Sequence, residues 1–271
     1  MIKRAINSVV DTIAEKRLTT VAGAWVYYFL IALIPLAFLV VTAFSVFNVS
    51  LTNDLVSRLP IEFREIGRVI ALTAENASKG ATVFFVITVI FSCTTLLNQM
   101  SKDGDFIYGM HSSIKRGLMR RGFALLALAL LFGLFLALAF LLAFSPSIKF
   151  YFLSGEKNQI ILNIFIFSIV ILFGYGIIIT LNTFICPKKV KITTHLLGSL
   201  ISLCIMVLGT IGFIVYLRYF ARYNLFYGSL ASIIIFLLWA YILMLGLAIG
   251  VIINMKIYRH KLKGDDYAKN R

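Results

Sequence analysis

The sequence predicts an all-α membrane protein with six transmembrane helices, and two observations carry this prediction. Apolar residues make up 61% of the 271-residue chain and charged residues only 14%, with a mean hydropathy of +0.96 that lies well above the range of soluble globular chains. The apolar residues also gather in long uncharged runs, and a helix needs about 20 such residues to cross a hydrocarbon core of about 30 Å. Runs of this length are too long for the strands of an outer-membrane barrel. We therefore expect one membrane domain.

Six runs are the candidate spans, at residues 21–47, 81–100, 122–148, 159–184, 192–217 and 226–255. The first is much too long for the hydrophobic part of a cleaved signal peptide. It contains Pro35, which removes one backbone hydrogen bond and clashes with the carbonyl of Ile31, so we expect a kink or break there. The freed carbonyl needs a partner, so Pro35 is expected to face protein or a wet cavity rather than acyl chains.

Two further segments have helical periodicity outside the spans. Apolar residues recur every three or four positions from Ile2 to Ile13, flanked by basic residues, which predicts an N-terminal interfacial helix on the cytoplasmic leaflet. The outer segment 48–80 repeats the pattern and is divided by Pro60, which predicts one or two short amphipathic helices. These helices could cap a cavity or simply connect two spans, and the sequence leaves both readings open.

The distribution of basic residues predicts the orientation. Most of the 26 Lys and Arg residues fall in the N-terminus, in the second and fourth connections between spans, and in the tail 256–271. These regions alternate along the chain, so the positive-inside rule places both termini on the cytoplasmic side of the membrane. Because the basic residues are spread over four connections without a recognisable binding fold, we do not expect nucleic acid as a partner.

Residues that would support catalysis are missing from the spans. No charged residue or histidine lies near the centre of any run, which disfavours ion-coupled transport, although carbonyls at a broken helix could still bind a cation. The histidines form no HExxH pair of the metalloprotease type, and no GxxxxGK loop for nucleotide phosphates is present. The carboxylate pair Asp103 and Asp105 is interpreted as part of an ordinary solvated loop. The cysteines at 93, 186 and 204 are interpreted as packing residues. We expect no enzyme activity, no cofactor and no metal.

Residues in the spans, together with residues at the outer end of the fifth span, could instead line a groove for a lipid headgroup. The candidates are Tyr27, Tyr28, Pro35, Asn98, Tyr175, Asn182, Arg218, Arg222, Asn224 and Tyr241. Arg218 and Arg222 are one helical turn apart among tyrosines, which suits phosphate at headgroup depth but is also typical of interfacial anchoring. At the cytoplasmic mouth, anionic headgroups could be recruited by Arg120, Arg121, Lys188 and Lys189. The glycines and serines of the last two spans are first explained by close helix packing.

Three stretches carry a resemblance to a known family. The pattern A-x-x-YY-x-L-x-x-L-x-P from Ala24 to Pro35, the stretch CPKKVKITTHLLGSL and the last span YGSLASIIIFLLWAYILMLGLAIGVIIN resemble the YihY/BrkB family of bacterial inner-membrane proteins. The resemblance implies six spans with cytoplasmic termini. Members were long labelled ribonuclease BN, an activity for which this chain lacks the residues. It also departs from the family at Ile252, where members often carry Glu, and at Ala32.

The sequence therefore favours a translocator or exporter of lipid or of a lipid-linked envelope substrate, with membrane lipids, chiefly anionic ones, as its partners. It carries no ATP-binding motif, so lipid would equilibrate passively or with energy from a partner. The alternatives are a non-transporting scaffold that binds envelope proteins, and a small-solute exporter with a closed cavity. Oligomeric state stays open.

Overall fold

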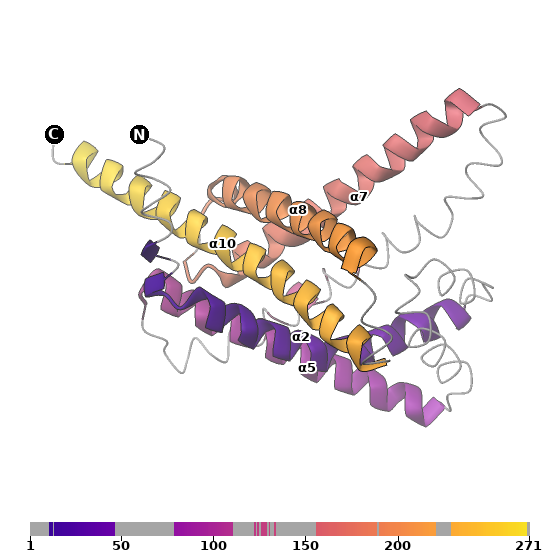
Figure 1. Cartoon of the computed structure of the whole chain (residues 1–271). Helices are drawn as coiled ribbons and strands as arrows, with labels where there is room; N and C mark the ends of the chain where they lie inside the picture. Colours follow the sequence, from indigo (N-terminus) through magenta and orange to yellow (C-terminus); the bar gives the residue numbers. More distant parts are fainter. Residues whose placement is uncertain are drawn as a thin grey trace. The chain divides into compact units, whose positions relative to one another are not determined.

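The computed structural model describes residues 11–12, 14–46, 79–110, 122, 124, 126–128, 130, 133, 156–188, 190–220 and 229–269. All regular structure in these residues is helical, which confirms the all-α part of the prediction. The described elements are α2 (Leu18–Val46), α5 (Lys79–Tyr108), α7 (Glu156–Ile185), the short 3-10 helix η1 (Ile192–Thr194), α8 (Leu196–Phe220) and α10 (Ser229–Lys269), and the α-helices are labelled in Figure 1.

Four stretches of these helices are long and apolar enough to cross a membrane: Val83–Tyr108, Phe167–Ile185, Leu196–Tyr216 and Ile234–His260. They correspond to the second, fourth, fifth and sixth predicted spans. A shorter apolar stretch, Leu18–Leu33, belongs to the first. Of the predicted span 122–148 only a few positions up to Gly133 are described, all helical. Nearly all of the N-terminal interfacial helix and of the outer segment 48–80 lies outside the described residues. Six spans stay a prediction, because the third span is described only in part.

Two helices extend past the predicted spans. α5 continues eight residues beyond the predicted end at 100, and α10 continues into the predicted tail 256–271 as far as Lys269. Charged side chains can end the membrane-embedded part of a helix without ending its backbone hydrogen bonding, because water satisfies them at the interface. In α5 and α10, the point where the sequence stops being apolar therefore indicates the edge of the membrane and not the end of the helix.

α2 is helical from Leu18 to Val46 with Pro35 inside it, so the predicted break is not seen. Pro35 is buried, as expected for a proline whose freed carbonyl needs a protein partner. The residues around it form a small core of Ala32, Val89 and Cys93, against which Leu36 and Leu128 pack.

The chain divides into two compact units. One consists of Leu30–Cys93 and Leu128–Ile177 and contains the core around Ala32. The other, called here the α8–α10 unit, consists of Met1–Phe29, Thr94–Ala127 and Ile178–Arg271. α2, α5 and α7 each contribute residues to both units, and α8 and α10 belong wholly to the second.

Small residues bring α8 and α10 together within the α8–α10 unit, where the two helices run side by side (Figure 1). A Cβ atom added to Gly198 would lie 2.5 Å from the carbonyl oxygen of Gly250, and the reverse distance is also 2.5 Å. Farther along the two helices, Gly246 of α10 packs against the side chain of Ile205, and Gly209 of α8 packs against the side chain of Ile242. Small residues four positions apart let membrane helices approach closely and gain van der Waals contact without a hydrophobic driving force. The predicted packing role of these glycines is confirmed.

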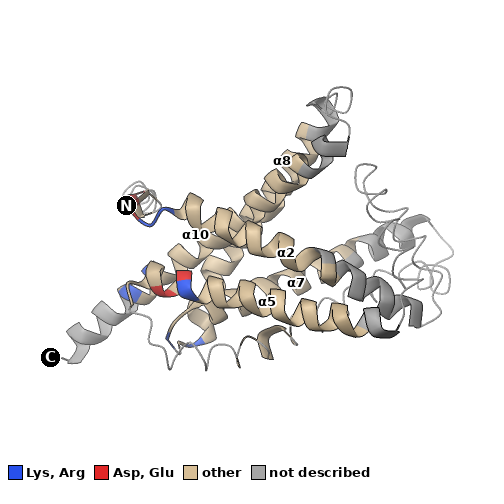
Figure 2. Ribbon diagram, turned by 90° about the horizontal axis from the view of Figure 1, so that it is seen from below, with Lys and Arg blue, Asp and Glu red and all other residues tan. Residues whose placement is uncertain are grey.

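The charged residues whose side chains are described all belong to the α8–α10 unit and gather toward one end of its helices (Figure 2). At this end α5 closes with Gly109 at φ 73°, the Gly109 N–H donating to the carbonyl of Phe106 and the Met110 N–H to that of Asp105. These two bonds are those of a Schellman motif.

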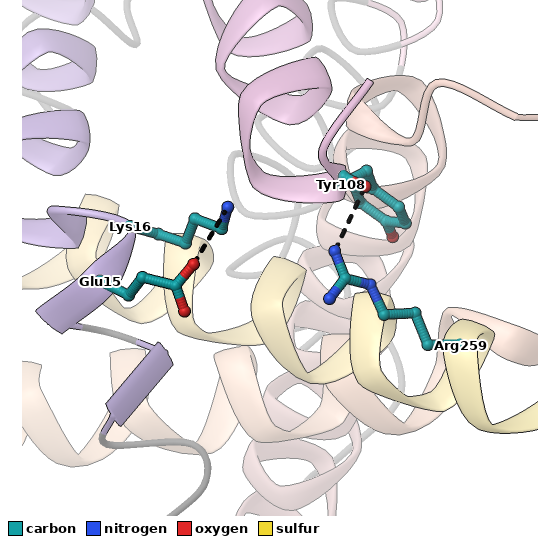
Figure 3. A network of polar contacts seen from close by, with 4 residues as sticks. All are labelled: Glu15, Lys16, Tyr108 and Arg259. Atoms are coloured by element: carbon teal, nitrogen blue, oxygen red, sulfur yellow. Dashed lines mark hydrogen bonds and ion pairs between the residues drawn. The ribbon is translucent and has the colours of Figure 1, made fainter.

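A cation from α10 completes this end of α5. Arg259 Nη2 donates to the carbonyl oxygen of Tyr108 at 3.4 Å, where a cation also complements the negative end of the helix dipole (Figure 3). Nearby, Lys16 Nζ lies 3.6 Å from Glu15 Oε1 and 5.2 Å from the ring centre of Phe106. The charged end is thus organised by contacts between helices.

The outward faces of the spans are apolar. Phe91, Leu126 and Leu208 are each more than two-thirds exposed, and many other large aliphatic and aromatic side chains are exposed to a smaller extent. A soluble monomer rarely exposes so much contiguous apolar surface, whereas lipid acyl chains solvate it without cost. These faces support the membrane assignment.

Candidate functional site

The start of α8 is capped by a residue of another helix. The first N–H groups of a helix have no partner within it and are normally bonded by a Ser, Thr, Asp or Asn side chain just before the first turn. In α8 the residue at that position is His195. Asn254 of α10 supplies the capping hydrogen bond instead, because its Oδ1 accepts from the Gly198 N–H at 3.0 Å. The absence of a Cβ on Gly198 leaves room for this amide.

A second polar contact joins the end of α7 to the same turn of α8. Asn182 Nδ2 donates to Ser199 Oγ at 2.8 Å. One turn further along α8, Ser202 Oγ lies against Gly250 of α10, and Gly250 is itself one turn before Asn254. We call Asn182, His195, Ser199, Ser202 and Asn254 the polar seam, because they are buried polar residues on neighbouring turns at the start of α8 and on the parts of α7 and α10 that contact these turns.

The polar seam is closed to the surface. Its five side chains are between 0% and 2% exposed. Yet five of its polar atoms find no hydrogen-bond partner among the described residues: Asn182 Oδ1, Ser202 Oγ, Asn254 Nδ2 and both ring nitrogens of His195. Leaving one buried polar group unpaired costs about 1–3 kcal/mol, so the strip retains unused hydrogen-bonding capacity inside an apolar bundle.

His195 contributes a neutral ring to this strip. Its burial lowers the pKa of the imidazole from the ordinary 6.5, because desolvation penalises the charged form. A neutral imidazole has one nitrogen that donates and one that accepts. The polar seam therefore offers donors and acceptors without a formal charge.

A separate contact corrects our reading of Asp103 and Asp105 as members of a solvated loop. Both lie on α5, and Asp105 is only 2% exposed. Asp103 accepts from Trp25 Nε1 of α2 at 2.7 Å and from Gln99 Nε2 at 3.1 Å. Hydrogen bonds to a carboxylate are shorter and stronger than those between neutral groups, so this contact links α2 to α5 at the charged end.

The predicted groove residues fall in different parts of the molecule. Asn182 is in the polar seam, whereas Tyr27 is 60% exposed, and Tyr28, Asn98 and Tyr241 are partly buried elsewhere in the α8–α10 unit. Pro35 and Tyr175 belong to the other unit. Within the α8–α10 unit, Asn182 is therefore the one member of the described predicted set that belongs to the polar seam.

The predicted basic sites are only partly described. Lys188 is exposed, with its Nζ 5.9 Å from the ring centre of Tyr258. Arg218 lies in α8, but its side chain is not among those described. The remaining predicted sites, Arg120, Arg121, Lys189, Arg222 and Asn224, lie outside the described residues.

Sequence reasoning missed four of the five residues that make the seam polar. The serines of the last two spans, which include Ser199 and Ser202, were assigned to helix packing, and neither His195 nor Asn254 was predicted as a site residue. The spacing of His195, Ser199 and Ser202 at four and three residues does put them on one helix face, and that signal could have found them. Asn254 could be recognised only from the packing of α10 on α8.

Metal binding has no support in the described part of the chain, which holds no group of three His, Cys, Asp or Glu side chains able to ligate one ion. Cys186 follows α7 directly and is buried, and burial raises the pKa of its thiol. The expectation that this cysteine packs rather than reacts agrees with its position.

Comparison with known proteins gives one consistent result. A family model described as "Virulence factor BrkB" matches residues 9–271. A UPF0761 membrane protein of Haemophilus influenzae (strain 86-028NP) is 28% identical over 244 residues, covering 88% of each chain. One of Aliivibrio fischeri (strain MJ11) is 23% identical over 256 residues, covering 90% of this chain and 80% of its own. No solved structure matches. This multi-pass membrane protein belongs to the BrkB family.

Proposed function

We propose that this chain is a translocator that lets lipid, or a lipid-linked envelope substrate, cross the bacterial inner membrane. The observation that carries the proposal is the polar seam, a strip of buried polar side chains with unused hydrogen-bonding capacity between apolar helices. Hydrocarbon is a poor solvent for a headgroup, because each unpaired polar group transferred into it costs several kcal/mol. A strip of amide, hydroxyl and imidazole groups lowers that barrier.

Neutral chemistry suits such a path. A fixed charge inside the bundle would bind one kind of headgroup and oppose release, whereas neutral donors and acceptors can exchange partners as a headgroup passes. None of the five residues of the polar seam is Asp, Glu, Lys or Arg. Transport along it would follow the lipid gradient, or take energy from a partner protein.

The charged end of the α8–α10 unit supports recruitment of anionic lipid. Lys188 and Arg259 are exposed there, and each basic residue near an anionic bilayer surface contributes about 1 kcal/mol to attraction. With this end in the cytoplasm, as the positive-inside rule requires, anionic headgroups would concentrate close to the start of α8. Both chain termini would then be cytoplasmic, and no catalytic step is needed.

The test is a flipping assay in liposomes. The purified protein is reconstituted with a fluorescent phosphatidylglycerol, and dithionite bleaches the label in the outer leaflet; proteoliposomes should lose more than half of the fluorescence, and protein-free liposomes about half. Replacing Asn182 with Leu should slow translocation about fivefold, the effect of one net hydrogen bond of about 1 kcal/mol on a rate.

The matched control is Thr210→Val in α8. Thr210 Oγ1 donates to the carbonyl of Met206 and accepts from Trp239 Nε1, so its polar groups are satisfied by protein and lie outside the polar seam. It should leave translocation unchanged. Equal bleaching with and without protein, over several labelled lipids, contradicts the proposal and favours the scaffold, which cross-linking in native membranes would then identify.

A further inference from the structure

The unpaired atoms of the polar seam form a balanced set. Asn254 Nδ2 and one nitrogen of His195 are free donors, Asn182 Oδ1 and the other nitrogen are free acceptors, and Ser202 Oγ can do either. Buried polar groups in proteins are almost always bonded to protein or to a bound molecule. The composition of the set therefore indicates the chemistry of whatever bonds to it.

The residues that bear these atoms lie on neighbouring turns of α8 or contact those turns. Asn254 is fixed to Gly198 by its Oδ1, which places its Nδ2 at the first turn of α8. Asn182 is fixed to Ser199 by its Nδ2, which leaves its Oδ1 beside the same turn. Ser202 is one turn further along, against Gly250. His195 precedes Ser199 by one turn, so its ring starts from the same face of α8.

Ionic ligands do not match this set. A phosphate oxygen only accepts, so Asn182 Oδ1 and the acceptor nitrogen of His195 would stay unpaired and would repel it. An ammonium group only donates, and Asn254 Nδ2 would oppose it. A hydroxyl group both donates and accepts, so it can satisfy either kind of atom.

We propose that the polar seam is a binding site for hydroxyl groups, supplied by water or by a hydroxylated lipid headgroup such as glycerol or a sugar. The inference rests on the proposed function only for the lipid source, where it names the substrate class. Bound hydroxyl groups also explain why α8 and α10 stay packed together. They would remove the desolvation cost of the five buried polar atoms that have no partner among the described residues.

Occupancy is tested by deleting atoms that have no partner among the described residues of the protein. In an unoccupied seam, Ser202→Ala and His195→Phe remove unpaired groups and leave the thermal midpoint of the detergent-purified protein unchanged or higher. In a hydroxyl-binding site each variant loses a bond, and the midpoint should fall by about 2–4 °C. Ser168→Ala, at an exposed serine of α7, measures the effect of the exchange itself. If His195→Phe fails to fold, Ser202→Ala decides the question. Midpoints at or above wild type overturn the proposal.

The source of the hydroxyl is resolved by adding short-chain lipids to delipidated protein. Dihexanoyl phosphatidylglycerol carries two headgroup hydroxyls, and dihexanoyl phosphatidylcholine carries none. If the lipid supplies the hydroxyl, the glycerol lipid raises the midpoint more than the choline lipid, and this difference disappears in Ser202→Ala but persists in Thr210→Val. If water supplies it, the two lipids act alike while Ser202→Ala still lowers the midpoint. Both results support the site.

Failure of this inference can be told apart from failure of the proposed function. Variants that keep wild-type midpoints in a protein that flips lipid overturn the hydroxyl site and leave the translocator intact. Variants with lowered midpoints in a protein that flips nothing support the site and overturn the translocator.

Discussion

Gly250 is the position where the contact between α8 and α10 is most sensitive to size. A Cβ atom at this position would overlap Ser202 Oγ and lie 2.5 Å from the backbone oxygen of Gly198. Backbone cannot rotate away as a side chain can, so Gly250→Ala must push the helices apart. Overpacking of this kind costs about 1–3 kcal/mol. Separation would also stretch the 3.0 Å bond from the Gly198 N–H to Asn254, a cap worth about 1 kcal/mol.

The matched control is Gly212→Ala on α8, where an added Cβ meets nothing within 4 Å. Alanine has the higher helix propensity, so this variant should be neutral or more stable by up to about 1 kcal/mol. Thermal unfolding followed with a thiol-reactive dye measures both variants against wild type. We expect Gly250→Ala to lower the midpoint by several degrees and Gly212→Ala to leave it unchanged or raise it. Equal midpoints for the two variants would refute the close packing of α8 on α10.

Three further predictions follow from single contacts. Trp25→Phe removes the donor to Asp103 and should cost about 1.5–3 kcal/mol, the range for a hydrogen bond to a charged group; an unchanged midpoint would contradict this. The pKa of His195 is lowered in the folded state, so the unfolded state binds the proton more readily. The contribution of His195 to the free energy of unfolding is therefore fully present above about pH 6.5 and is lost as the pH falls toward the folded-state pKa. His195→Gln should flatten this pH dependence of stability between pH 5 and 8. Cys186, buried and with a raised pKa, should react with maleimide only as the protein unfolds, and rapid labelling at pH 7 in the folded state would count against its placement.

The sequence predicted membrane helices well because composition and run length are local properties. The positions of α5, α7, α8 and α10 follow from apolar runs that a bilayer must accommodate. Helix ends were less predictable. α5 ends at Tyr108, eight residues past the predicted end at 100, and Gly109 closes it in a Schellman motif. A glycine followed by no apolar periodicity was the available signal.

The site was less predictable because its members come from three helices. Asn182 was chosen as a polar residue in an apolar run, and the structure places it in the polar seam. Tyr27 was chosen for the same reason, yet it is exposed. Polarity within a span does not reveal which way a side chain faces when the helix is apolar on all sides, since no amphipathic stripe then defines an inner face.

The same reasoning explains why Asp103 was misread. An acidic residue next to Lys102 looks like part of a solvated loop, and only the approach of Trp25 from α2 shows that the carboxylate links two helices. A tryptophan in an apolar run must place its indole N–H somewhere, and partner choice depends on tertiary structure.

The departure at Ile252 gains a physical meaning from the packing of α10. Family members often carry Glu two residues before the asparagine that is Asn254 here, and in this chain Ile252 is fully buried. A glutamate there would need a buried partner or would have to take up a proton, because an isolated buried charge is too costly. With isoleucine at position 252, the side-chain hydrogen bond at this end of α10 is made by the neutral amide of Asn254. Under the proposed translocator function, a neutral seam would select by donor and acceptor pattern rather than by charge. Selection among anionic lipids would then depend on headgroup hydroxyls, and charge would act only at the membrane surface.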